Sequence, residues 1–206
     1  MDMRERLLEA ALAHVPFDGW TETALMRAAA DLGLSRDEAR RAFPGGAAEM
    51  VEAFSLMADR RMVEELEARD SAALRTTERV RAAVQIRLQQ AEPWREAVQR
   101  ALAFLALPQN APLAAKLLWR TVDTIWRAAG DTATDWNHYS RRGLLAGVFS
   151  ATVLYWLTDS SEGRADTWDF LDRRLAGLAS FGKATSKIRD RLSSTARRYR
   201  PYRARR

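Results

Sequence analysis

Residues 111–129 are predicted to form a helix that is apolar over most of its circumference. At about 100° per residue, its charged side chains fall within one wedge only about 60° wide. The wedge contains Lys116, Arg120, Asp123 and Arg127, and the rest of the surface is mainly Leu113, Leu117, Leu118, Trp119, Val122, Ile125, Trp126 and Ala129. A helix of this kind is buried on several sides. We therefore expect it to form either the centre of a helical core or the wall of an apolar cavity.

The chain as a whole is predicted to be all-α. Apolar side chains recur at helical spacing along its 206 residues, and no run of alternating β-branched residues indicates a strand. An apolar content of 47% is enough for a sizeable core and argues against disorder throughout. Cysteine is absent, which excludes disulfides, thiolate metal sites and cysteine nucleophiles. No uninterrupted apolar stretch reaches the roughly 18 residues of a membrane-spanning helix.

Residues 1–70 are predicted to form a helix-turn-helix-like domain. Its expected helices cover residues 4–15, 21–32, 35–43 and 47–68. The segment Pro16–Gly19 is expected to break the first helix, Thr21 or Thr23 to cap the second, and Ser35 with Glu38 to form a capping box on the third. The layout resembles the N-terminal domain of TetR-type regulators, in the run LLEAALAHVPFDGWTETALMRAAADLGLSRDEARRAFPGGAAEMVEAFS.

The charge of this domain disfavours DNA binding. Residues 1–60 carry seven basic and eleven acidic side chains, a net charge of −4. Neutralisation of phosphates supplies most nonspecific affinity for DNA, so an acidic domain starts at a disadvantage. The helix that would read bases opens with Asp37 and Glu38, where a recognition helix faces the bases and phosphates. Its arginines, Arg36, Arg40 and Arg41, argue in the opposite direction.

Residues 71–182 are predicted to be a larger helical domain for ligand binding and dimerisation. Within the helix predicted up to Thr158, Gly143, Gly147 and Ala151 recur at four-residue spacing and present small side chains on one face. Such a face lets another helix approach closely. We expect a helix–helix contact between two copies of the chain, with a further helix over residues 166–181, and a contact within one chain is the alternative.

Residues 183–206 form a basic tail. They carry ten basic residues and one acid, net +9, so that the remainder of a chain with a total charge of +6 is acidic, at −3. A basic amphipathic helix binds anionic membrane surfaces. The residues expected to contact the membrane are Lys187, Ile188, Arg191, Leu192, Arg198 and Tyr199. A solvated tail and a nucleic-acid-binding tail are the alternatives.

The sequence contains no recognisable set of catalytic residues. Its two histidines are His14, which we interpret as structural, and His138, three residues after Asp135. A carboxylate and a histidine at that spacing make half of a di-iron motif, and no second pair exists to complete it. Ser140 follows His138 too closely to complete a triad, because near neighbours on a helix do not face each other. We expect no enzymatic activity, no metal and no cofactor.

Three runs of the sequence resemble a known family. They are PWREAVQRALAFLALPQNAP, TVDTIWRAAGDTATDWNHYSRRGLLAGVFSATVLYWLTDSSEG and DTWDFLDRRL. In these runs the chain is similar to the ninth Coq family, the accessory lipid-binding proteins of ubiquinone biosynthesis, which have a TetR-like fold. The resemblance covers about residues 90–182 and extends more loosely over the N-terminal helices.

The resemblance implies a noncatalytic homodimer that has lost operator binding. It implies a bound lipid (an isoprenoid, a quinone intermediate or a phospholipid) in the C-terminal domain. It also implies docking on an anionic membrane surface and presentation of the aromatic intermediate to the demethoxyubiquinone hydroxylase. The N-terminus, MDMRERLLEAAL, has no apolar h-region, and its acids argue against a mitochondrial presequence. We therefore expect a bacterial, cytoplasmic member that associates peripherally with the inner face of the membrane.

The resemblance also assigns residues. The hydroxylase-facing surface corresponds to Asp135, Asn137, His138, Tyr139 and Arg141, and the family often has an aromatic residue where this chain has His138. The cavity wall is expected to contain Leu102, Leu105, Leu118, Val122, Ile125, Trp126, Leu145 and Phe149. The alternative to a lipid-presenting protein is a TetR-type transcriptional regulator whose apolar cavity binds an effector.

Overall fold

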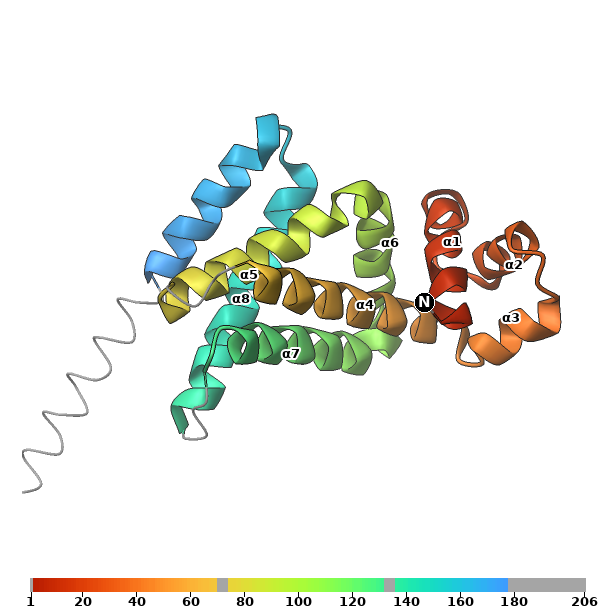
Figure 1. Cartoon of the computed structure of the whole chain (residues 1–206), viewed down its shortest axis with the longest axis horizontal. Coiled ribbons are helices and arrows are strands. Elements are labelled where there is room, and N and C mark those ends of the chain that lie inside the picture. Colours follow the sequence, from red (N-terminus) through yellow and green to blue (C-terminus); the bar gives the residue numbers. More distant parts are fainter. Residues whose placement is uncertain (1, 70–73, 132–135, 178–206) are drawn as a thin grey trace, which may run out of the picture.

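The structure, a computed structural model, describes residues 2–69, 74–131 and 136–177, and the side chains of residues 136–138 are outside that description. Within these ranges the chain contains helices and no strand, which confirms the all-α prediction (Figure 1). The α-helices are α1 (Met3–Asp18), α2 (Glu22–Asp31), α3 (Arg36–Ala42), α4 (Gly46–Ala68), α5 (Thr76–Ala91), α6 (Arg95–Leu105), α7 (Ala111–Ala128) and α8 (Trp136–Thr158), followed by a helix over residues 165–177. The 3₁₀ turns are η1 (Glu92–Trp94), η2 (Pro108–Asn110) and η3 (Glu162–Arg164).

Side-chain caps begin α2 and α3 as predicted. The Thr21 hydroxyl accepts a hydrogen bond from the Ala24 N–H at 3.4 Å, and Ser35 and Glu38 form the expected capping box. The predicted break at Pro16 is wrong, because α1 continues to Asp18. Proline this close to the C-terminus removes only one intrahelical hydrogen bond, and the helix ends at Gly19, which has a φ of 69°.

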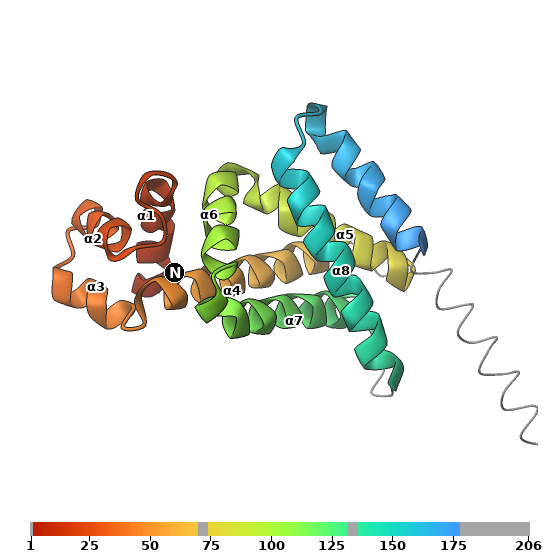
Figure 2. The same cartoon turned by 180° about the vertical axis from the view of Figure 1, so that it is seen from behind.

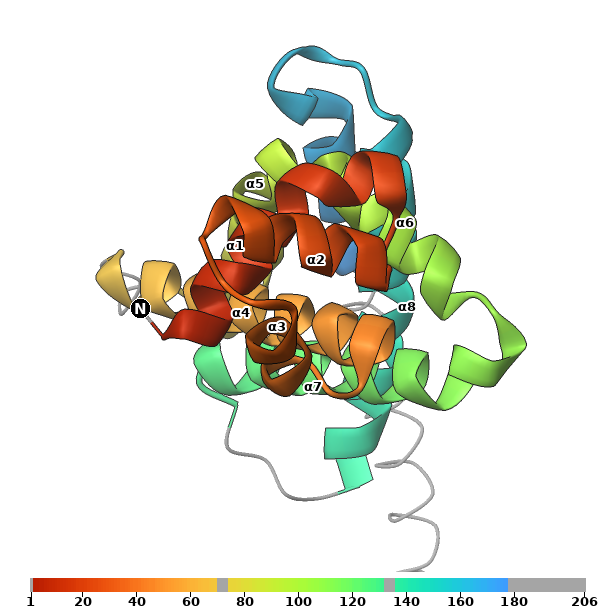
Figure 3. The same cartoon turned by 90° about the vertical axis from the view of Figure 1, so that its right-hand side faces the viewer.

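The N-terminal helices dock on α4 and α6 (Figure 3). Trp20 is 4% exposed, and its indole N–H donates to the Ala97 carbonyl of α6 at 3.0 Å. Its ring lies 5.3 Å from the ring of Phe54 on α4. Arg100 also donates to the Pro16 carbonyl at 2.9 Å. These contacts fix the helix-turn-helix-like part against the larger part of the chain.

Helix α4 joins the two buried clusters of the protein. Its first half, which includes Phe54 and Met57, lies in a first cluster with α1, α2 and α6. Its second half, with Met62 and Leu66, lies in a second cluster with α5, α7, α8 and the helix 165–177. The second half of α4 therefore packs with the larger part of the chain. The predicted division at residue 70 stays a prediction, and the tail 183–206 lies outside the described residues.

Helix α7 lies at one side of the bundle, with α4, α5 and α8 on its inner side. The expectation that it is buried on several sides is wrong. One stripe, including Leu117, Val122 and Ile125, is buried, whereas Trp119 is 41% exposed. The charged wedge is used to hold neighbouring helices. The ammonium group of Lys116 lies 2.8 Å from a carboxylate oxygen of Glu52 on α4, and Arg120 and Asp123 also form ion pairs with other helices.

Helix α8 runs across α5, α4 and α7, and the helix 165–177 folds back beside it (Figure 2). Among the described residues, no single helix is long and apolar enough to cross a membrane. The pair Thr76–Leu105 and Pro108–Ala128, bent by 96°, meets the same test jointly by length and composition.

The turn after α8 depends on Asp159, which is 6% exposed. Its carboxylate accepts hydrogen bonds from the N–H of Ser161 at 2.8 Å and from the N–H and hydroxyl of Thr167 at 3.0 and 2.6 Å. Burial opposes ionisation, but the hydrogen bonds from Thr167 and Ser161 outweigh it and hold the pKa of Asp159 well below its ordinary value. The carboxylate therefore caps the first turn of the helix 165–177.

We predict that Asp159→Ala lowers the free energy of unfolding by about 1–3 kcal/mol, because it leaves buried donors without an acceptor. Asp159→Asn keeps one carbonyl oxygen and is expected to cost less. Since the folded-state pKa is depressed, the carboxylate stabilises the fold above the ordinary pKa of Asp, about 3.9, and this stabilisation is lost as the pH falls further. Urea unfolding at pH 7 and pH 3.5 measures both effects. A difference between wild type and Asp159→Asn that grows at pH 3.5 would contradict the assignment.

Candidate functional site

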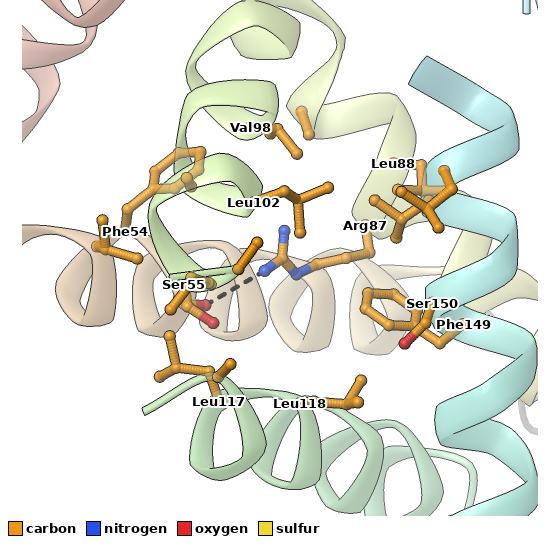
Figure 4. A pocket seen from close by; sticks show the side chains of 18 residues that line it. Phe54, Ser55, Arg87, Leu88, Val98, Leu102, Leu117, Leu118, Phe149 and Ser150 are labelled. Atoms are coloured by element: carbon orange, nitrogen blue, oxygen red, sulfur yellow. Dashed lines mark hydrogen bonds between the residues drawn. The ribbon is translucent and has the colours of Figure 1, made fainter. Parts of the chain in front are cut away.

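A cavity of about 340 Å³ lies between α4, α5, α6, α7 and α8 (Figure 4). Nearly all of its lining is apolar. The lining residues are Val51, Phe54, Ser55, Arg87, Leu88, Ala91, Val98, Ala101, Leu102, Leu105, Ala106, Ala114, Leu117, Leu118, Phe149, Ser150, Val153 and Leu154. Ala106 and Leu154 are exposed on the protein surface, so we place the mouth of the cavity at these residues. A space of this size and polarity is suited to an apolar small molecule.

The sequence creates this space with chain breaks and small residues. The 3₁₀ turn that contains Pro93 redirects the chain between α5 and α6, and the turn that begins at Pro108 redirects it again between α6 and α7. Alanines then stand where larger side chains would fill the gap: Ala91, Ala101, Ala106 and Ala114. The helices that surround the cavity therefore meet without closing it.

Half of the predicted wall residues line the cavity. They are Leu102, Leu105, Leu118 and Phe149. The other four, Val122, Ile125, Trp126 and Leu145, belong to or pack against the second buried cluster and do not line it. Periodicity identified them as buried but did not reveal that their side of α7 and α8 packs into that cluster. Lipid binding by the four wall residues stays a prediction.

One residue of the cavity wall, Arg87, belongs to a buried ion pair. Arg87 on α5 is 9% exposed and Asp59 on α4 is 4% exposed, and the Arg87 Nε–H donates to an Asp59 carboxylate oxygen at 2.9 Å. The Thr121 hydroxyl on α7 contacts both Asp59 oxygens, at 3.0 and 2.9 Å. The network thus links three of the five helices around the cavity.

Sequence reasoning missed this network, although one signal pointed to it. Arg87 lies three residues after Val84 and seven after Val80, so it falls in the middle of the buried stripe of α5. A charged side chain at such a position needs a partner. The identity of that partner was hidden, because Asp59 lies on another helix and 28 positions away.

Of the five residues predicted to face a partner, the structure describes the side chains of two, Tyr139 and Arg141. Tyr139 is 62% exposed, and its ring stacks on Trp119 of α7 at 6.1 Å. The side chain of Arg141 is 49% exposed and lies 3.3 Å from the Asp131 carboxylate. Asp135 lies outside the described residues, as do the side chains of the other two, Asn137 and His138.

Sequence reasoning also did not predict the ion pair of the buried Arg142, the residue that follows Arg141 of the predicted surface. Arg142 is 1% exposed, and its Nε–H donates to the Asp123 carboxylate at 2.7 Å. This pair ties the start of α8 to α7, close to Trp119 and Tyr139. The two consecutive arginines therefore differ in exposure: Arg142 is buried, whereas Arg141 is partly exposed.

One face of α8 is open in the described chain. Gly143 and Gly147 are exposed, and a Cβ atom added at either would meet nothing within 4 Å. Apolar side chains continue the same face, with Leu144 42% and Leu154 60% exposed. No described helix of the same chain covers these glycines. The contact within one chain that the sequence left open is therefore absent there, and the contact between two copies stays a prediction.

The helix-turn-helix-like part has few free cationic groups. On α3, Arg40 lies 2.8 Å from the Glu22 carboxylate of α2. Glu38 is used in the capping box, where hydrogen bonds from the Ser35 hydroxyl and N–H hold its pKa below its ordinary value. Arg36 and Arg41 are exposed. The surface of α3 therefore presents two arginines beside acidic groups.

No group of three potential metal-binding side chains occurs in the described ranges. His14 lies with its Nε2 2.6 Å from the carboxylate of Asp31, a contact between α1 and α2. This contact agrees with the structural role predicted for that histidine.

Comparison with known proteins shows two kinds of similarity. The family model described as COQ9 matches residues 111–182. A Rattus norvegicus protein described as "Ubiquinone biosynthesis protein COQ9, mitochondrial" is 37% identical over 194 residues, which cover 91% of this chain and 62% of that protein. The Homo sapiens protein of the same description is 36% identical, with 91% and 61% covered. The chain thus spans about three fifths of the length of these relatives.

Among solved structures, the chain is similar to one described as the TetR transcriptional regulator from Nitrosomonas europaea ATCC 19718. The TM-score is 0.70 at 25% sequence identity, and the match covers 86% of this chain and 98% of that one. The predicted TetR-like fold is therefore confirmed.

We predict that Asp59→Ala lowers the free energy of unfolding by about 3–5 kcal/mol, because it leaves the charge of Arg87 buried without a partner. The double variant Arg87→Met/Asp59→Leu removes both charges at similar volume and is expected to cost much less. Urea unfolding of the two variants and the wild type gives the comparison. If the double variant were as unstable as Asp59→Ala, the ion pair would not be the reason for the loss.

Proposed function

Because the chain belongs to the COQ9 family, we propose that it is a noncatalytic lipid-binding protein of ubiquinone biosynthesis. In this proposal it binds an isoprenoid or quinone intermediate at a membrane surface and presents it to the demethoxyubiquinone hydroxylase. The family supplies the pathway, since the curated relatives are described as ubiquinone biosynthesis proteins. The cavity supports the lipid-binding part of the proposal.

The observation that carries the proposal is the apolar cavity of about 340 Å³. Fully packed cores leave few voids larger than a water molecule, and an apolar space of this size is stabilised by filling it with an apolar ligand. Its lining residues come from five helices, and one of them, Arg87, is held in place by its ion pair with Asp59. The space is therefore part of the folded architecture and suited to a prenyl chain or ring.

The mouth of the cavity supports exchange with a membrane. Leu107 and Leu154 are 44% and 60% exposed, and Leu154 belongs to the cavity lining. Apolar side chains at a mouth allow a lipid to pass from a bilayer without full exposure to water. We propose that this side faces the membrane and that the basic tail, residues 183–206, adds electrostatic attraction to anionic lipids. A bacterial origin and a place on the inner face of a membrane remain predictions.

The hydroxylase would dock beside α7 and α8. Trp119 and Tyr139 form a partly exposed aromatic pair, and Arg141 provides a charged group at its edge. Aromatic and arginine side chains are enriched among residues that dominate binding energy at protein interfaces. We propose that this group contributes to the surface on which the hydroxylase binds.

We propose that the chain is a homodimer joined through α8. The face that contains Gly143, Leu144 and Gly147 is open, and its small residues allow a second helix to approach closely. An interface of this kind is isologous, so that the same face of α8 meets itself across a two-fold axis.

A transcriptional regulator with an effector cavity is the second candidate function. The similarity to a structure described as a TetR transcriptional regulator favours it. The charges on the helix-turn-helix-like part oppose it, because Arg40 is paired with Glu22 and residues 1–60 carry a net charge of −4. We therefore place this function second.

We predict that organic extracts of the purified protein contain a stoichiometric isoprenoid or quinone, and that Ala114→Phe abolishes its retention. Ala114 lines the cavity, and a phenyl ring there opposes a ligand by about 1–3 kcal/mol, or roughly tenfold or more in affinity. Ala115→Phe is the matched control, because the neighbouring Ala115 is exposed and does not line the cavity. Mass spectrometry of the extracts is the readout. Equal lipid in the two variants, or none in the wild type, would contradict the proposal.

We predict that Gly147→Glu converts a dimer into a monomer, because a dimer would bury the new carboxylate without a partner. Ala13→Glu places the same charge on an exposed position of α1 and is expected to leave the dimer intact. Size-exclusion chromatography with light scattering measures both masses. A wild-type monomer, or a dimer that survives Gly147→Glu, would show that α8 does not form the interface.

A further inference from the structure

Arg87 is the one charged residue among the described side chains that line the cavity. Its Nε–H donates to Asp59, and its Nη2 lies 3.5 Å from the Ser55 carbonyl oxygen. Its third nitrogen, Nη1, makes no hydrogen bond within the described part of the chain. Figure 4 shows the guanidinium group among the lining side chains, with one nitrogen directed to Ser55 and another turned away from it. The cavity therefore has an N–H donor, on a side chain that is 9% exposed, that a ligand can reach.

This donor is presented without net charge. Asp59 neutralises Arg87, and the Thr121 hydroxyl lies at hydrogen-bonding distance from both oxygens of the same carboxylate. The other polar lining residues, Ser55 and Ser150, are uncharged. The orientation of the Arg87 guanidinium group is fixed because its Nε and Nη2 both contact residues of α4. A ligand therefore meets a preorganised N–H group in an apolar and electrically neutral space.

We propose, building on the lipid-binding function proposed above, that Arg87 Nη1 donates a hydrogen bond to an uncharged oxygen of the ligand, the carbonyl of a quinone-type ring. Arg87 thereby selects a prenylated quinone over other lipids and sets the direction in which it binds. The ring lies at the ion pair, and the prenyl tail leads toward the mouth at Ala106 and Leu154.

The alternatives fit this donor less well. A hydrocarbon would cover Nη1 and leave this donor without an acceptor. A site that hydrogen-bonds its proper ligand discriminates against a ligand that lacks the acceptor. A fatty-acid carboxylate or a phospholipid phosphate would add a charge that the Arg87–Asp59 pair does not balance, in surroundings where unpaired charges are costly. A quinone carbonyl supplies the acceptor without a charge.

The size of the cavity agrees with this direction of binding. At about 340 Å³ it lies near the lower limit of ordinary ligand pockets, which span about 300–1,000 Å³. A substituted ring and the start of a tail fill such a volume, so that a longer tail must leave through the mouth. Because the mouth is lined by apolar residues, the emerging tail stays in contact with apolar surface.

The test compares three ligands on the wild type and on variants. The ligands are a geranyl-substituted dimethoxymethylbenzoquinone, geranylbenzene as its oxygen-free counterpart, and oleate as an anionic lipid. Displacement of a fluorescent apolar probe gives each affinity. The double variant Arg87→Met/Asp59→Leu removes the donor without leaving an unpaired charge. Arg81→Met/Asp172→Leu, which removes another arginine–carboxylate pair of α5 that does not line the cavity, is the matched control. Binding of geranylbenzene to the double variant shows that its cavity remains folded.

We expect the wild type to prefer the quinone to both other ligands. The double variant should lose affinity for the quinone by about tenfold, the value of one hydrogen bond, and retain its affinity for geranylbenzene. Arg81→Met/Asp172→Leu should keep the quinone affinity, because this pair lies outside the cavity lining. Equal binding of quinone and geranylbenzene by the wild type would overturn the role of Arg87 while leaving lipid binding intact. Tighter binding of oleate that depends on Arg87 would overturn the selection of a neutral oxygen. Failure of the wild type to bind any of the three would overturn the lipid-binding function itself.

Discussion

The larger part of this structure depends on one buried ion pair, between Arg87 of α5 and Asp59 of α4. Both side chains are nearly inaccessible, and Thr121 of α7 completes the network. A buried pair of this kind contributes little net stability compared with apolar packing, but either charge alone is costly. The pair therefore acts as a constraint on geometry. Three helices must keep their spacing for it to form, and the same spacing leaves the adjacent space unfilled.

The other features of the molecule are arranged around that space. Alanines and chain breaks keep it open, while the contact from Trp20 to the Ala97 carbonyl fixes the helix-turn-helix-like part against α6, one of its walls. The acidic charge of that part and the pairing of Arg40 oppose DNA binding. In the proposed function, this TetR-like fold supplies a cavity for the ligand and an open face of α8 for a second copy of the chain. Its N-terminal helices serve as a packed support.

The sequence predicted local structure better than the site. The capping box at Ser35 and the cap at Thr21 were correct, because they depend on residues three positions apart. Burial was harder to predict. The periodicity of α7 identified its apolar residues but not which neighbours cover them, so that Trp119 is more exposed than expected and half of the predicted cavity wall lies in the core. The pairing of Arg87 with Asp59 was beyond reach, since it joins two helices whose packing no local pattern specifies.

Photoaffinity mapping can show whether the cavity holds the prenyl ligand. A ubiquinone analogue with a diazirine on its prenyl tail would be bound, irradiated and located by peptide mass spectrometry. If the ligand lies in the cavity, α6, α7 and α8 will be labelled at cavity residues such as Leu102, Leu118 and Phe149, and unlabelled quinone will reduce the labelling. Labelling confined to surfaces outside the cavity, such as the exposed Trp119, would show that the lipid binds elsewhere and that the cavity is not its site.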